Sequence, residues 1–203
     1  MSINVCNDRS MASITSLPSG VSGSSLVLIS EQTASSSATI SFTSGIDSTY
    51  KEYIFKFTDI HPATDNTDLT FNGSTDSGSN YNVTKTTTMF RAIHNEADND
   101  TELGYDTGGD LAQSTNFQSL IRSIGTDNDQ CGVGTLHLFD PSNTTFVKHF
   151  IQTSNSYGSA SNDYSRNQFF AGYLNTTSAI DAVQFKMASG NIDSGTIKMY
   201  GVT

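Results

Sequence analysis

Three acidic turns are the segments of this sequence whose residue types could bind a metal ion. They are residues 65–68, 98–102 and 127–129. Each combines Asp with Asn, and hard cations such as Ca²⁺ prefer clustered carboxylate and carbonyl oxygens. The middle turn is the strongest candidate, with Asp98, Asp100 and Glu102 as ligands, although it lacks the glycine and final glutamate spacing of an EF-hand. Asp and Asn are also the usual residues of turns, so ordinary turns are the alternative.

The histidines and glutamates do not form a pattern typical of a catalytic site. The four histidines, His61, His94, His137 and His149, are not spaced as paired zinc ligands. The sequence contains neither a G-x-S-x-G nucleophile elbow nor a glycine-rich phosphate loop. It therefore predicts a protein without catalytic activity and without a cofactor. A glycan-cleaving enzyme is the alternative, because two facing carboxylates can come from different strands and leave no motif.

Tyr157 and Tyr164 are the residues best suited to contact a glycan. Both lie in residues 154–167, a segment rich in Ser and Asn. Tyrosine among small polar residues forms recognition surfaces at a low cost in conformational entropy. The same composition also suits contacts between subunits, and ordinary turn tyrosines are a third interpretation.

The composition limits the partners that the protein can have. Ser, Thr, Asn, Gly and Asp supply 104 of the 203 residues, and the net charge is −10. This charge repels phosphate backbones, so we expect no nucleic-acid binding. No stretch approaches 18 consecutive apolar residues, so we expect no membrane insertion. The first residues lack the basic start and the apolar run of a secretory signal.

Alternating apolar and polar residues predict an all-β fold. In residues 38–42, 53–57 and 183–187 every second side chain is apolar, which is typical of half-buried strands. The apolar run 26–29 predicts a buried strand. Roughly ten such short strands with polar turns between them indicate an antiparallel β-sandwich of jelly-roll type. Residues 110–121 are predicted to form either a helix or a long crossing loop.

Residues 1–25 differ in composition from residues 26–203. They contain a Ser- and Gly-rich stretch typical of a linker, with too little apolar content for a core of its own. We therefore expect an extended N-terminal anchoring arm over 1–25 and a β-sandwich domain over 26–203. Within the arm, Ile14, Leu17 and Val21 are the apolar side chains expected to bind a partner. An arm folded back on its own sheet is the alternative.

Several segments resemble the virion structural proteins of marine tailed phages, of the kind found in cyanophages and pelagiphages. A strand with a Ser-rich turn at 34–42 is followed by the Tyr-x-x-Tyr-x-Phe stretch at 50–55. Residues 71–74 and 81–82 are similar to the same proteins. The closing stretch 185–201 resembles the strand with a Gly-Asn-x-x-x-Gly-Thr-Ile pattern that ends those chains. The resemblance covers most of the chain, and it implies a lineage and a strand pattern without catalytic residues.

The resemblance implies a role on the surface of a virion, as a capsid-decorating or fibre-like protein. Such a protein is assembled in the host cytoplasm, needs no secretory signal and has other capsid or tail proteins as partners. The chain has no extended repetitive shaft, which favours a short, directly anchored protein in a symmetric homo-oligomer. The alternative function is a receptor- or carbohydrate-binding module of a tail fibre, which would contact host-surface glycans.

Overall fold

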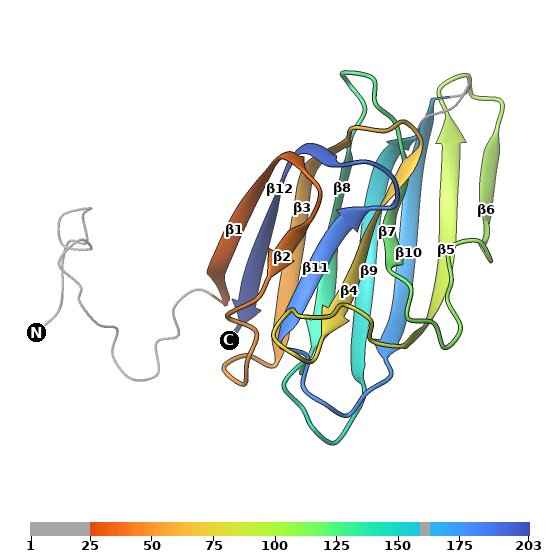
Figure 1. Ribbon diagram of the computed structural model, residues 1–203. Coiled ribbons are helices and arrows are strands. Elements are labelled where there is room, and N and C mark those ends of the chain that lie inside the picture. Colours follow the sequence, from red (N-terminus) through yellow and green to blue (C-terminus); the bar gives the residue numbers. More distant parts are fainter. Residues whose placement is uncertain (1–24, 159–162) are drawn as a thin grey trace, which may run out of the picture.

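A computed structural model describes residues 25–158 and 163–203 of the chain (Figure 1). The described residues form twelve β-strands and no helix. The strands are β1 (Leu26–Ser37), β2 (Ile40–Phe42), β3 (Glu52–Pro62), β4 (Thr67–Ser74), β5 (Lys85–Asn95), β6 (Thr101–Tyr105), β7 (Gln118–Ile124), β8 (Gly132–Phe139), β9 (Lys148–Gly158), β10 (Tyr164–Leu174), β11 (Ala182–Met187) and β12 (Ile192–Val202). Each pair of neighbouring strands is antiparallel. The predicted all-β, antiparallel class is therefore confirmed.

The strands form one continuous sheet that folds over into two layers. The large layer runs β1-β12-β3-β8-β9-β10-β5-β6, and the small layer runs β7-β4-β11-β2. Figure 1 shows the small layer lying across the large one. A single bridge between Ile124 of β7 and Gly158 of β9 joins the two layers. The described residues include no helix that is long and apolar enough to cross a membrane.

Aromatic side chains from both layers fill the space between them. Phe185 on β11 is fully buried, and its ring lies 5.3 Å from that of Phe55 and 5.2 Å from that of Phe57, both on β3. Farther along, the ring of Phe71 on β4 meets that of Phe150 on β9 at 5.0 Å. The alternation of the sequence explains this arrangement, because every second residue of a strand faces the same side.

Two expectations about individual segments are wrong. Residues 110–121 contain no helix: residues 110–117 form a loop held against β5, in line with the alternative, and residues 118–121 belong to β7. The buried carboxamide of Gln118 stabilises this course by accepting a hydrogen bond from Thr87 and donating one to the carbonyl of Gly109. The run 26–29 is not buried either. It begins the edge strand β1, and Leu28 is 50% exposed.

Candidate functional site

The ends of three neighbouring strands place the residues of the candidate site. Tyr157 on β9 lies opposite Ser165 on β10, and Ser165 lies opposite His94 on β5. These antiparallel pairs run without a register shift over eleven residues, so the three side chains form one row across the sheet. Sequence reasoning identified Tyr157 but missed His94 and Ser165, because nothing in the sequence shows which strands pair.

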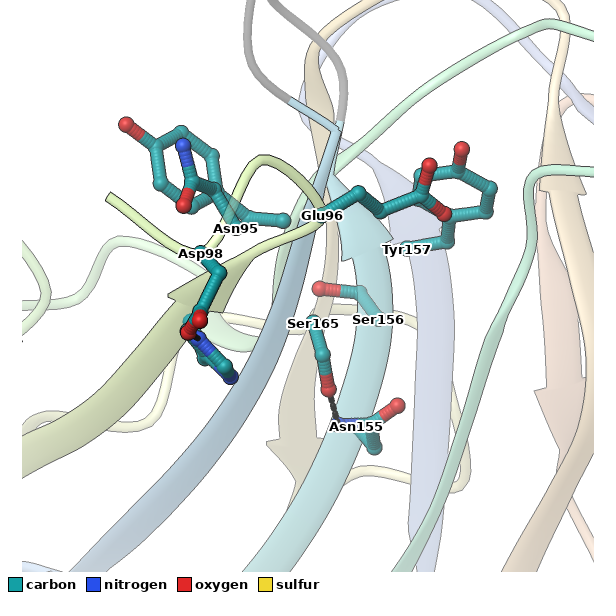
Figure 2. Close-up of a pocket in the computed structure, with 9 residues that line it drawn as sticks. Asn95, Glu96, Asp98, Asn155, Ser156, Tyr157 and Ser165 are labelled. Carbon is teal, nitrogen blue, oxygen red and sulfur yellow. Dashed lines mark hydrogen bonds and ion pairs between the residues drawn. The ribbon is translucent and has the colours of Figure 1, made fainter. Parts of the chain in front are cut away.

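A pocket of about 410 Å³ opens at this row (Figure 2). Its lining includes Asp98, Tyr157 and Tyr164, three residues that were singled out from the sequence, together with Asn155 and Glu96. The fold thus brings the predicted tyrosines and the middle acidic turn to one place, although about sixty residues of chain separate Asp98 from Tyr157.

Hydrogen bonds hold the middle acidic turn to the rim of the pocket. The side-chain oxygen of Asn95 accepts hydrogen bonds from the backbone N–H groups of Asn99 (3.1 Å) and Asp100 (3.0 Å). The hydroxyl of Tyr164 donates to Oδ2 of Asp100 at 2.6 Å. The turn is therefore closed by its own side chains in the manner that Asn and Asp turns commonly are.

The three carboxylates proposed as metal ligands contact different partners. Asp98 lies 3.0 Å from Nε2 of His94, Asp100 accepts from Tyr164, and Glu102 pairs with Arg91 at 3.2 Å. Within residues 25–158 and 163–203, no group of three or more His, Cys, Asp and Glu side chains is arranged to hold a metal ion. The geometry of this turn therefore supports the alternative of an ordinary turn.

Tyr157 is a neutral hydrogen-bonding group at the mouth of the pocket. Burial, the negative charges of Asp163 and Glu96 and a hydrogen bond with Glu96 together raise the pKa of its phenol to about 12. Figure 2 shows the Glu96 carboxylate directed at the Tyr157 ring. The amide of Asn155 donates to the hydroxyl of Ser165 at 3.2 Å. Phenol, amide and hydroxyl groups beside aromatic rings can bind a sugar.

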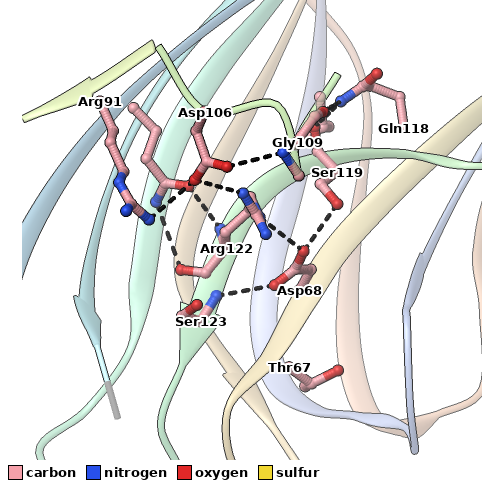
Figure 3. Close-up of polar contacts among 12 residues, drawn as sticks. Thr67, Asp68, Arg91, Asp106, Gly109, Gln118, Ser119, Arg122 and Ser123 are labelled. Carbon is pink, nitrogen blue, oxygen red and sulfur yellow. Dashed lines mark hydrogen bonds and ion pairs between the residues drawn. The ribbon is translucent and has the colours of Figure 1, made fainter. Parts of the chain in front are cut away.

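A second polar cluster, which the sequence did not reveal, fixes the strands behind the pocket (Figure 3). Asp106 lies 2.9 Å from Nη1 of Arg91 on β5 and 2.8 Å from Nη1 of Arg122 on β7. Arg122 also pairs with Asp68 on β4 at 3.2 Å, and Asp68 accepts a hydrogen bond from the Ser119 hydroxyl. The four charged residues come from three strands and a loop and share no motif. They connect β5 to the small layer.

The remaining predicted site residues lie beyond the described part of the chain. Ile14, Leu17 and Val21, which were expected to bind a partner, fall within residues 1–24. Their role stays a prediction.

Comparisons with protein-family models, with curated proteins and with solved structures found no match to this chain.

Proposed function

We propose that the chain is a structural component of a tailed-phage virion, exposed on the particle as a capsid-decorating or fibre-like subunit. It acts by binding, without catalysis or a cofactor. The observation that carries this proposal is the order in which the strands pair, and the sequence resemblance to phage virion proteins supports it.

The strand order supports a jelly roll. Eight of the strands pair in a nested order, from the outermost pair in the sequence inward: β1 with β12, β2 with β11, β3 with β8, and β4 with β7. This nested order arises when a long antiparallel ribbon folds over on itself. Jelly rolls are common in viral capsid and lectin domains. On this interpretation the large layer is extended by four additional strands, β5, β6, β9 and β10. The link from this fold to a virion function is an analogy between folds.

The N-terminal arm, residues 1–25, is the proposed anchor. Its apolar side chains Ile14, Leu17 and Val21 would bind a capsid or tail protein, while the acidic domain faces outward. A segment that becomes ordered on binding can contact a large surface for its length. The net charge of −10 keeps such a domain soluble and limits unspecific adhesion.

Replacing the apolar residues of the arm tests the anchor within the full chain. Purified protein is incubated with virions that lack it, and the bound amount is measured by quantitative mass spectrometry. We expect the triple variant Ile14→Ser, Leu17→Ser, Val21→Ser to lose most of its binding. The matched control replaces three serines of the same segment by alanine. Equal occupancy of the variant and the unchanged chain would show that the arm is not the anchor, and failure of the unchanged chain to bind any virion would overturn the structural role.

The second candidate function is glycan recognition at the 410 Å³ pocket, and the convergence of Tyr157 and Tyr164 there favours it. A glycan array with the purified chain would identify a ligand. On this hypothesis Tyr157→Ala and Tyr164→Ala abolish binding, whereas Tyr200→Ala, a change on β12 away from the pocket, preserves it. An array without any bound glycan, or equal binding by all variants, would remove this candidate.

A further inference from the structure

The outward side of β8, β9, β10, β5 and β6, here called the outer face, carries an unusual distribution of side chains. An antiparallel sheet with one covered side normally has apolar residues inside and polar residues outside. On β9 the buried residues include Gln152 and Ser154, while Ile151, which precedes them and points to the outer face, is 52% exposed. On β10 Gln168 is buried, while Phe169 on the outer face is only half-buried. These strands therefore place apolar side chains where water would be expected to lie.

The exposed apolar side chains of the described residues gather on this outer face. Eight large hydrophobic side chains are exposed among the described residues, and five of them lie on the outer face: Phe90, Leu103, Tyr105, Val133 and Ile151. Leu103 is 78% exposed. The rings of Phe90 and Phe169 stack at 4.6 Å and 10°, which forms a flat aromatic surface across β5 and β10. Contiguous apolar patches of this kind commonly mark interaction sites.

The five strands of the outer face also place no charged side chain on that face. Among the described residues, none of the outward side chains of these five strands is Asp, Glu, Lys or Arg. Arg91 and Glu102, which belong to β5 and β6, lie on the opposite side of the sheet from Phe90. Depletion of charge and enrichment in aromatic residues distinguish the core of a protein interface from the rest of a surface.

The outer face is large enough for a stable interface. With strands about 4.8 Å apart and about 3.3 Å per residue, five strands of about nine residues cover roughly 700 Å². A standard interface buries about 800 Å² on each partner. A hollow of about 480 Å³, lined by His149, Ile151 and Tyr173, gives this face relief into which a side chain of a partner can fit.

We propose that a second copy of this chain covers the outer face. Two copies that each carry a charge of −10 repel each other, so they approach most favourably through surfaces without charge. The outer face is uncharged and aromatic, so two copies can pack these faces together without bringing like charges into contact. A two-fold axis, the commonest symmetry of homo-oligomers, places the same face of each copy against the other. A basic partner would instead be attracted to the acidic parts of the surface.

This inference rests on the proposed structural role and names one partner of the domain. Its test needs no virions, so that self-association and particle binding can fail separately. Sedimentation velocity of the 203-residue chain over a range of micromolar concentrations is expected to show a dimer. Phe90→Lys and Ile151→Lys would place like charges in the interface and raise the dissociation constant of the dimer about tenfold or more. Leu28→Lys, on the exposed edge strand β1, is the matched control and should leave the constant unchanged.

A measurement on the unchanged chain covers the case in which a variant does not fold. Hydroxyl-radical footprinting at low and high protein concentration reports the solvent access of individual side chains. We expect Phe90 and Phe169 to become protected as the concentration rises, whereas Leu28 stays reactive. A chain that remains monomeric, variants that dimerise normally, or protection at Leu28 in place of Phe90 would each overturn the proposal.

Discussion

Lys85 provides a quantitative test of the structure, because its amine is buried without a counter-charge. The residue is fully buried on the inward side of β5, and its Nζ donates to the carbonyl of Asn116 at 2.6 Å. None of the ion pairs formed among the described residues includes it. Burial lowers the pKa of this amine from 10.5 to about 7. In the unfolded chain the same amine is solvated and keeps its proton to higher pH.

The sign and size of the effect on stability follow from this difference. Between pH 7 and 10.5 the unfolded state binds one more proton at Lys85 than the folded state, so the free energy of unfolding increases with pH. The contribution is complete above the unfolded pKa and is lost as the pH falls through the folded one. At 1.36 kcal/mol per unit, a rise from about pH 7.5 to about 9.5 adds about 2 to 3 kcal/mol.

The assay compares urea unfolding of the unchanged chain and of Lys85→Met over this pH range. Circular dichroism is a suitable signal, because the chain contains no tryptophan. We expect the difference in unfolding free energy between the two proteins to change by about 2 to 3 kcal/mol. Lys56→Met, which removes an exposed amine from β3, is the matched control. Parallel curves for the unchanged chain and Lys85→Met would refute the argument.

Three further predictions test the core, the charged cluster and the pocket. Phe185→Ala should lower the free energy of unfolding by about 3–5 kcal/mol in urea, and a loss below about 1 kcal/mol would contradict a packed aromatic core. Asp106→Asn removes the carboxylate shared by Arg91 and Arg122, so we expect a loss of about 1–3 kcal/mol that shrinks at high salt. A loss independent of salt would mean that packing, and not charge, explains the effect. In a spectrophotometric titration, Tyr157→Phe should remove one phenol that ionises near pH 12, whereas loss of a phenol that ionises near pH 10 would contradict the described surroundings of Tyr157.

The fold class was predictable because strand periodicity is a local property of the chain. Residues 53–57 and 183–187 alternate in the sequence, and they form parts of β3 and β11 with Phe55 and Phe185 in the core. The helix considered for 110–121 is absent because long-range contacts, and not local periodicity, decide the structure of this segment. Its apolar spacing is compatible with a helix, but pairing with β4 and the buried hydrogen bonds of Gln118 favour a strand.

The candidate site was predictable only in part. Tyr157, Tyr164 and Asp98 were singled out by their types, and the pocket contains all three. The sequence did not indicate that His94 would join them, because that contact depends on the register of β5, β10 and β9. The cluster of Asp106 with Arg91 and Arg122 has the same origin, since long-range pairing brings together residues that share no motif.

The sequence by itself determined that this chain forms antiparallel strands, that its surface is acidic and which tyrosines lie near a polar loop. These properties depend on residue types and on neighbours close in the chain. Only the tertiary structure decided which side of β5, β9 and β10 faces inward. Both sides of these strands mix polar and apolar residues, so a period of two defines two faces without ranking them. The small layer and the loop over residues 110–117, which is hydrogen-bonded to β5, decided which face is buried. Gln152 and Gln168 lie on the covered face, whereas Ile151 and Phe90 stay exposed.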